Sequence, residues 1–236
     1  KADIPAKKGK VIYFAGCMTH LTPAIISSMK TIFNAAGEEY QFADEGGGVC
    51  CGRPLMLAGK TNAAQEIIEK NSKMIKNSGA ETLILSCPIC YKIFKEEYKL
   101  KNITILHHTE YIKSLLKRGK ITLNRNNEKF AYHDPCDLGR GMGIYEEPRY
   151  ILSEIGEVVK VEKERKESLS CGGSLGSLTL NNDDRTKITQ KAVASLIEEK
   201  PEKIITACPL CMKTFTPHSP VPVEDIAKTV ADNILK

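Results

Sequence analysis

Nine cysteines are the residues of this chain whose spacing could do chemistry. Residues 1–10 contain no apolar signal segment, so the expected compartment is reducing, where thiols stay free or bind metal. The number of cysteines is odd, which also argues against a disulfide framework. Metal binding is therefore the leading interpretation for the cysteines, which are Cys17, Cys50, Cys51, Cys87 and Cys90 in the first half and Cys136, Cys171, Cys208 and Cys211 in the second.

The adjacent pair Cys50 and Cys51, in "GGGVCCGRP" (46–54), distinguishes between kinds of metal site. Neighbouring side chains leave the backbone in different directions and do not easily bind one ion together. The irons of an iron–sulfur cluster are spread over several ångströms, so two diverging thiolates can each reach a different iron. Cluster binding explains this pair better than a single ion does.

Three other interpretations stay open at this point. Buried free cysteines behave as small apolar residues, and a thioredoxin-like dithiol would explain one CxxC motif while leaving the other cysteines unexplained. Structural zinc is the stronger rival, because CxxC is its usual half-site. Zinc takes four ligands, so it fits the four thiols of the second half better than the five of the first.

The cysteines recur at a nearly constant offset, which indicates an internal duplication. Ser170 stands where this register calls for a partner of Cys50, so the second half lacks one thiol. The offset is 119 for Cys17 and Cys136, 120 for Cys51 and Cys171, and 121 for Cys87 and Cys208. The aligned segments are "VIYFAGC" (11–17) with "KFAYHDPC" (129–136), "ETLILSCPICYKIFK" (81–95) with "EKIITACPLCMKTFT" (202–216), and "HHTEYIKSLLK" (107–117) with "PVEDIAKTVAD" (222–232).

Hydrophobic periodicity predicts the elements that must position these cysteines. Gly37 and Gly79 are expected to end two of the helices. Strand and helix alternate, so the predicted fold class is α/β, with two tandem pseudo-symmetric repeats that are each a parallel sheet flanked by helices. The first repeat is expected at 1–118, a polar linker at 119–128 and the second repeat at 129–236. Within the first repeat we predict strands at 10–15, 40–42, 82–86 and 103–106, helices at 22–36, 60–78 and 108–118, and a short helix after the CxxC motif.

In parallel sheets of this kind, ligands bind outside the carboxyl ends of the strands. Each CxxC motif and each first cysteine of a repeat follows a predicted strand, and the remaining cysteines lie in glycine-bearing loops. Cys90 and Cys211 are expected in a first helical turn, whose free N–H groups favour thiolate, and Pro88 and Pro209 stiffen that turn. Glycines 46–48 and 172–173 would let the backbone approach a bulky cluster.

Composition and charge exclude two classes of partner. The net charge of +5 comes from 34 basic and 29 acidic residues, the lysines are scattered over predicted helix faces, and no tryptophan is present, so we expect no nucleic-acid binding. No apolar run reaches about 18 residues, so we expect no membrane span. The chain starts without an initiator methionine, which predicts a processed or shortened start. The expected location is cytoplasmic, or peripheral to a membrane through partners.

Other polar residues are weaker candidates. No spacing ties a histidine to a cysteine, so His20, His107, His108, His133 and His218 are expected to be structural or exposed. His133 and Asp134, just before Cys136, are the best candidates for supporting a ligand. Arg53 and Arg140 could neutralise an anionic cluster or make loop salt bridges, and "GRGMG" (139–143) is expected to be a turn.

The motif set resembles the cysteine-rich CCG domain of the B-type subunit of heterodisulfide reductase and of related iron–sulfur subunits of glycolate, lactate and anaerobic glycerol-3-phosphate oxidases. The resemblance covers both halves of the chain. It is carried by "GCM" (16–18), "CCGRP" (50–54), "CPIC" (87–90), "HDPCDLGRGMGIYEEPR" (133–149) and "CGG" (171–173).

This resemblance implies a cofactor for each half. In the first half it implies a noncubane four-iron four-sulfur cluster held by Cys17, Cys50, Cys51, Cys87 and Cys90. Ser170 departs from the family pattern and leaves four thiols in the second half. The second site would then hold a cubane four-iron four-sulfur cluster or zinc, or it would be empty. Its thiols are Cys136, Cys171, Cys208 and Cys211.

The resemblance also implies an oxidoreductase subunit that relays electrons or reduces a disulfide at the cluster. One alternative is the electron-transfer subunit of a flavin-dependent 2-hydroxy acid or glycerol-3-phosphate dehydrogenase, and another is a non-redox zinc-binding docking module. The chain has no ferredoxin-type CxxCxxC run, so electrons would come from other redox subunits or from a ferredoxin-like domain. The implied acceptor is a disulfide or is linked to quinone.

Overall fold

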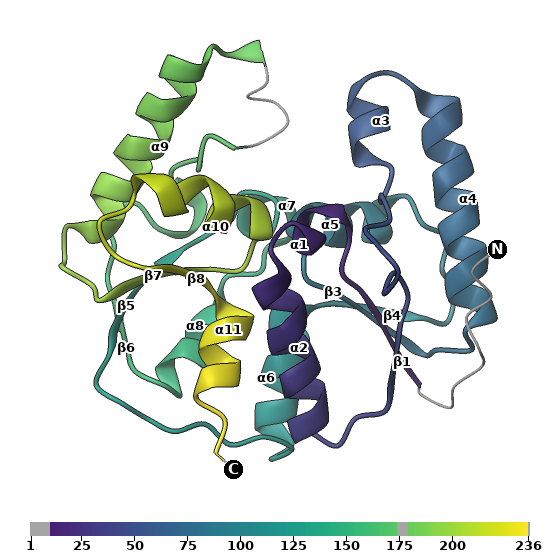
Figure 1. The fold of residues 1–236 in the computed structure, drawn as a ribbon, viewed down its shortest axis with the longest axis horizontal. Coiled ribbons are helices and arrows are strands. Elements are labelled where there is room, and N and C mark those ends of the chain that lie inside the picture. Colours follow the sequence, from purple (N-terminus) through teal and green to yellow (C-terminus); the bar gives the residue numbers. More distant parts are fainter. Residues whose placement is uncertain (1–9, 174–178, 236) are drawn as a thin grey trace.

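Two parallel sheets side by side form the framework of the molecule (Figure 1). The computed structural model describes residues 10–173 and 179–235. Residues 1–9, on which the expected processed start depends, and residues 174–178 of the second glycine loop lie outside the described residues. Helices flank both sheets, so the α/β fold class with tandem repeats is confirmed.

The first half contains a four-stranded sheet in the order β2-β1-β3-β4, and every pairing in it is parallel. Its elements are β1 (Val11–Phe14), α1 (Cys17–His20), α2 (Pro23–Ala35), β2 (Tyr40–Phe42), α3 (Arg53–Leu57), α4 (Thr61–Asn77), β3 (Thr82–Leu85), α5 (Pro88–Glu96), β4 (Thr104–His107) and α6 (His108–Lys117).

The second half repeats this sheet in the order β6-β5-β7-β8, again with parallel pairings throughout. Its elements are β5 (Lys129–His133), α7 (Gly139–Met142), α8 (Glu146–Ser153), β6 (Glu157–Val159), η1 (Arg165–Glu167), α9 (Asn182–Ile197), β7 (Lys203–Thr206), α10 (Pro209–Phe215), η3 (Thr216–His218), β8 (Val223–Asp225) and α11 (Ile226–Asp232).

Local sequence explains the central strands and the ends of the helices. All four residues of β1 are buried, as expected for a parallel strand covered on both faces by helices. Gly37 and Gly79 follow α2 and α4 with positive φ angles of 63° and 70°, which end each helix at little steric cost. The short helices α1 and α3 were not predicted, because four or five residues are too few to show a helical period.

The repeat register of the last segment differs from the sequence alignment. β4 places His107 opposite Leu85, and β8 places Asp225 opposite Thr206. His107 therefore corresponds to Asp225, and the alignment of 107–117 with 222–232 is wrong by three residues. No cysteine lies in this segment to fix the register, and α10 is shorter than α5.

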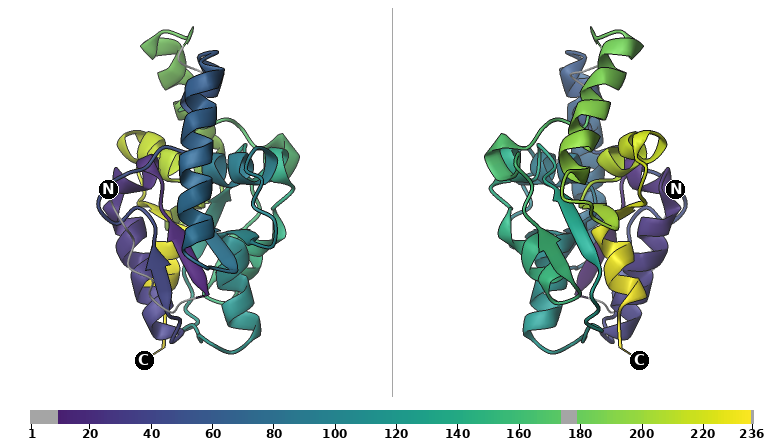
Figure 2. Two further views of the ribbon diagram at one scale, coloured as in Figure 1. Left: turned by 90° about the vertical axis from the view of Figure 1, so that its right-hand side faces the viewer. Right: turned by 90° about the vertical axis from the view of Figure 1, so that its left-hand side faces the viewer.

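The two halves pack crosswise through four helices (Figure 1). α2 of the first half lies against α11 of the second, and α6 of the first half lies against α8 of the second. Buried apolar side chains from both halves, such as Ile25 and Ile226, belong to one continuous core. Figure 2 shows α4 and α9 extending beyond the rest of the molecule on the same side. In the described ranges, none of the helices combines the length and apolar character of a transmembrane span.

A prediction follows from the shared core. Leu115 of α6 is 0% exposed, so Leu115→Ala should lower the free energy of unfolding by about 2–5 kcal/mol. Leu57 of α3 is 52% exposed, so the control Leu57→Ala should change it by less than about 0.5 kcal/mol. Chemical denaturation followed by circular dichroism would measure both. Equal effects of the two changes, or separate unfolding of the two halves, would contradict a shared core.

Candidate metal centre

The order of strands explains why distant cysteines meet. In the first sheet, the strand that follows β1 in the chain, β2, lies on one side of β1, and β3 and β4 are added on the other side. The second sheet repeats this switch of side, with β6 on one side of β5 and β7 and β8 on the other. The loops that leave such strands diverge and open a crevice at the carboxyl edge. Cys17 and Cys87 follow the central strands of the first half, and Cys136 and Cys208 follow those of the second.

The five thiols of the first half form a continuous run. Cys50 lies within hydrogen-bonding reach of Cys17 and of Cys51. Cys90 lies within the same reach of Cys51 and of Cys87. Cys51, Cys87 and Cys90 are buried, whereas Cys17 and Cys50 are half-buried. The run therefore has a buried end at the CxxC motif and an accessible end at Cys17 and Cys50.

Backbone N–H groups point at these sulfurs and favour thiolate. Gly52 N donates to Cys50 Sγ at 3.3 Å, and hydrogen bonds from Cys17 and Cys51 lower the pKa of Cys50 to about 2. Cys87 is the N-cap of α5, with Pro88 at the first helical position as predicted. The Cys90 thiol, followed by the N–H groups at the start of α5, lowers the pKa of Cys87.

Two glycines let the backbone come close to the thiol run. Gly16 has a φ of 80°, and a Cβ there would lie 3.0 Å from Cys90 Sγ. A Cβ at Gly48 would lie 2.9 Å from Cys17 Cα. The expected close approach of glycines 46–48 holds only at Gly48, because a Cβ at Gly46 or Gly47 would meet nothing within 4 Å.

The four thiols of the second half are less evenly gathered. Cys211 Sγ lies 3.4 Å from Cys171 Sγ, and Cys208 is within hydrogen-bonding reach of Cys211. These three residues are buried, and Cys136 is half-buried. Cys136 Sγ is 3.8 Å from Asp137 Oδ2, and burial together with this carboxylate raises the pKa of Cys136 to about 11.

Ser170 occupies the position of the missing thiol. Gly172 N donates to Ser170 Oγ at 3.2 Å, just as Gly52 N donates to Cys50 Sγ at 3.3 Å. The two loops are therefore alike at this hydrogen bond, where the first half offers sulfur and the second offers oxygen.

The two groups of thiols influence each other electrostatically. Burial raises the pKa of Cys208, and negative charge on Cys87 of the other half adds to this rise. Neighbouring thiols lower the pKa values of Cys87 and Cys171, and the Asp137 carboxylate opposes this lowering at both. Within the described ranges, no three or more histidine, cysteine, aspartate or glutamate side chains are arranged as ligands of one metal ion.

A buried carboxylate holds two loops together in each half. In the first half it is Asp44, which the sequence analysis did not single out, and in the second it is Asp134, which was named as a candidate for supporting a ligand. Asp44, after β2, accepts from Ala15 N and Gly16 N at 2.9 and 2.8 Å, and His20 Nε2 lies 3.2 Å away. These contacts hold the turn that leads into Cys17. Burial nevertheless raises the pKa of Asp44. The sequence signal that could have found it is an acid two residues after a short strand.

In the second half the roles of the two loops are exchanged: the acid follows the central strand β5 and holds the loop that follows the outer strand β6. Asp134, after β5, accepts from Arg165 N at 2.7 Å and forms a two-pronged ion pair with Arg149 at 2.7 and 2.8 Å. This carboxylate thus anchors the loop that leads to Ser170 and Cys171.

The remaining sequence candidates also have structural contacts. Arg140 donates to the backbone carbonyls of Lys166 and Ser168, so it stabilises the same loop. The ring of His133 packs edge-on against Phe215, and burial lowers its pKa to about 4. The "GRGMG" segment forms the single-turn helix α7.

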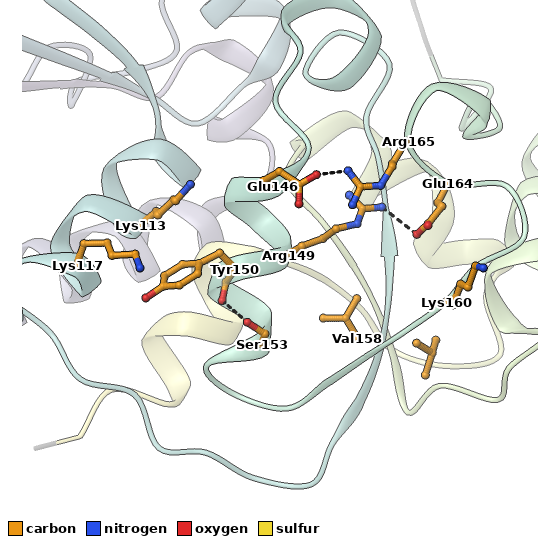
Figure 3. A pocket seen from close by; sticks show the side chains of 11 residues that line it. Lys113, Lys117, Glu146, Arg149, Tyr150, Ser153, Val158, Lys160, Glu164 and Arg165 are labelled. Atoms are coloured by element: carbon orange, nitrogen blue, oxygen red, sulfur yellow. Dashed lines mark hydrogen bonds and ion pairs between the residues drawn. The ribbon is translucent and has the colours of Figure 1, made fainter.

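A pocket of about 770 Å³ lies away from the thiols, between α6, α8 and the strand β6 (Figure 3). Its charged side chains are largely paired with one another. Arg165 contacts Glu146, Arg149 contacts Glu164 at 3.2 Å, and Lys117 lies over the ring of Tyr150. None of the nine cysteines lines this pocket.

Comparison with known proteins identifies similar sequences. The family described as a cysteine-rich domain, CCG, matches residues 11–95 and 130–216, which together make up more than half of the chain.

Three relatives are redox proteins. The D-type subunit of dihydromethanophenazine:CoB–CoM heterodisulfide reductase of Methanosarcina acetivorans is 29% identical over 96% of this chain and 59% of its own length. EtfAB:quinone oxidoreductase of Syntrophomonas wolfei is 28% identical over 87% of this chain and 31% of its own length. The B-type subunit of fumarate reductase (CoM/CoB) of Methanothermobacter marburgensis is 28% identical over 86% of this chain and 40% of its own length. The chain thus spans less than two thirds of each.

The unequal thiol pKa values predict an order of reactivity in the metal-free protein. Cys50 and Cys136 are both half-buried, but their pKa values are about 2 and about 11. The alkylation rate of Cys50 by iodoacetamide should be constant from about pH 5 to 8, whereas that of Cys136 should rise about tenfold per pH unit, because only thiolate reacts. Peptide mass spectrometry would measure both rates, and a tenfold rise per unit at Cys50 would contradict the assignment.

Proposed function

The chain belongs to the cysteine-rich CCG domain family, and from this premise we propose that it is the iron–sulfur subunit of an oxidoreductase. Its thiolates would hold a cluster at the carboxyl edge of the first sheet, and electrons would pass through that cluster. The relatives with redox names support this interpretation at the level of an iron–sulfur redox subunit.

The observation that carries the proposal is the run of five thiols in the first half. Five soft sulfur ligands that spread along a line suit a cluster with several irons better than one ion. When bound, the cluster supplies reversible electron transfer. The proposed ligands of this noncubane four-iron four-sulfur cluster are Cys17, Cys50, Cys51, Cys87 and Cys90.

The chain supports such an anionic group in two ways. The N–H groups of Gly52 and of the first turn of α5 donate to sulfur, which favours negative charge at this edge. Gly16 and Gly48 keep the backbone close without a side chain in the way. Both features match the donor set that a sulfide-containing cluster requires.

For the second half we propose a cubane four-iron four-sulfur cluster on Cys136, Cys171, Cys208 and Cys211. Four thiolates satisfy a cubane cluster, and the Ser170 hydroxyl supplies no fifth. The electrostatic influence of Cys87 on Cys208 supports a short path between the two centres. A second centre of this kind would pass electrons to or from the first.

The half-buried end of the first run favours a disulfide as the terminal acceptor. Cys17 and Cys50 are the accessible members, so a substrate sulfur could approach the cluster there. Reduction of one disulfide consumes two electrons and two protons and yields two thiols. A partner redox subunit or a ferredoxin-like domain would supply the electrons, and solvent would supply the protons.

Removal of one thiol should abolish the first centre alone. After anaerobic reconstitution, Cys51→Ala should lose the visible and electron paramagnetic signals of the first centre, and about half of the iron and acid-labile sulfide if both centres carry four irons. Cys171→Ala is the matched control in the second half, and circular dichroism would report the fold. A wild-type chain that binds zinc without sulfide, or an unchanged spectrum in Cys51→Ala, would contradict the proposal.

A reciprocal exchange tests the difference between the two halves. Ser170→Cys adds a fifth thiol in a loop that already has the geometry of Cys50, so the second centre should acquire the paramagnetic signal of the first. Cys50→Ser should change the first centre toward the signal of the second. If both exchanges leave the signals unchanged, the identity of this atom does not set the type of cluster.

A further inference from the structure

A buried acid and a buried imidazole from opposite halves meet between the sheets. His108 Nε2, at the start of α6, lies 3.5 Å from Asp225 Oδ1, at the N-cap of α11. Both side chains are 0% exposed. Among the described residues, this is the only ion pair of either group. The contact was hidden in the sequence, because the alignment placed the two segments three residues out of register.

The polar atoms of this pair are incompletely satisfied. Asp225 Oδ1 accepts from Ala227 N at 2.9 Å, but Asp225 Oδ2 has no hydrogen-bond partner. Neither ring nitrogen of His108 makes a hydrogen bond of normal geometry. A helix N-cap needs only one oxygen, and Asn or Ser could provide it. An ionisable acid that faces an imidazole in a buried interface therefore needs another explanation than capping.

The surroundings of the pair contain few ionisable groups. The faces that α2 and α8 bury carry no charged residue. Burial raises the pKa values of Tyr13 and Tyr132, and the charge of Asp225 adds to the rise at both. The buried titratable side chains on the elements around the pair are Tyr13 of β1, His107 of β4, Tyr111 of α6, Tyr132 and His133 of β5, and Cys211 of α10.

Burial sets the protonation of the two groups in opposite directions. It raises the pKa of Asp225 to about 7 and lowers the pKa of His108 to about 3. Near neutral pH the imidazole is therefore neutral, and the carboxyl is at the midpoint of its titration. The pair behaves as one site that binds a single proton in the physiological range.

The pair lies at the same sheet edge as the thiols. Asp225 is in register with Thr206, two residues before Cys208, and His107 is in register with Leu85, two residues before Cys87. The backbone carbonyl of Ser86 lies close enough to His108 to favour its protonated form. The buried Tyr132 lies within electrostatic reach of both Asp225 and Cys211, so the pair and the thiols of the second half act on a common buried group.

We propose that His108 and Asp225 form a buried proton site, built from both halves, that takes up one proton when the thiol edge gains one electron. The electron comes from the redox partner and the proton from solvent, so the added charges cancel. On oxidation the electron leaves and the pair releases the proton. This inference rests on the proposed function, because the electron must reside on a centre held by the cysteines.

The test compares Asp225→Asn with the control Asp232→Asn in the reconstituted protein. Asn keeps an oxygen for the N-cap but cannot exchange a proton, and Asp232 is an exposed acid on the same helix. As the pH rises above about 7, the midpoint potential of the wild type and of the control should fall by up to about 59 mV for each tenfold change in proton activity. In Asp225→Asn this slope should be absent. Equal slopes in all three proteins would overturn the inference.

A second variant and a cluster-free readout keep the test decisive. If Asp225→Asn does not fold, Asp225→Ser serves, because a hydroxyl also caps the helix and does not exchange a proton near neutral pH, so the slope should again vanish. In the cluster-free wild type, the infrared band of a protonated carboxyl should disappear as the pH rises through about 7. Absence of this band overturns the inference.

Metal analysis separates the two possible failures. If the wild-type chain incorporates iron and sulfide, but the pH dependence of its midpoint potential is the same as in Asp225→Asn, the proton site is overturned and the proposed function stands. A chain that incorporates no cluster overturns the proposed function, and the inference with it.

Discussion

The reversal of strand order at the centre of each sheet is the constraint on which the site depends. Because β1 and β3 are neighbours whose following loops turn apart, residues 70 positions distant, Cys17 and Cys87, leave the sheet at one edge. The buried strands below hold the edge fixed, and Asp44 holds the turn before Cys17. The glycine loop then needs only to fold over an edge that is already formed.

The two halves have the same strand order, but they differ in the side chains at the thiol edge. Ser170 keeps the hydrogen bond that Cys50 makes, yet it offers oxygen where the first half offers sulfur. Likewise, the acid that ties the loops together follows β2 in the first half and β5 in the second. The shared framework has therefore kept the geometry of its edge while the side chains that face the centre have changed.

Sequence reasoning recovered the fold class and the main elements, because cysteine spacing fixes the repeat and periodicity fixes the strands. It failed where contacts depend on packing between distant segments. Asp44 looks like an ordinary loop acid until its backbone partners are seen, and the loop that Asp134 anchors lies 31 residues away in the sequence. The meeting of His108 with Asp225 requires both the register of β8 and the crosswise packing of the halves, and neither leaves a local signal.

The crosswise packing of α2 on α11 and of α6 on α8 has a consequence for the origin of the chain. Each half covers its inner helices mainly with helices of the other half. A single ancestral unit would have exposed those apolar faces, and it would have covered them by pairing with an identical copy about a two-fold axis. Gene fusion of such a homodimer would give the present arrangement, and it would free one copy to lose a ligand while the other retained it.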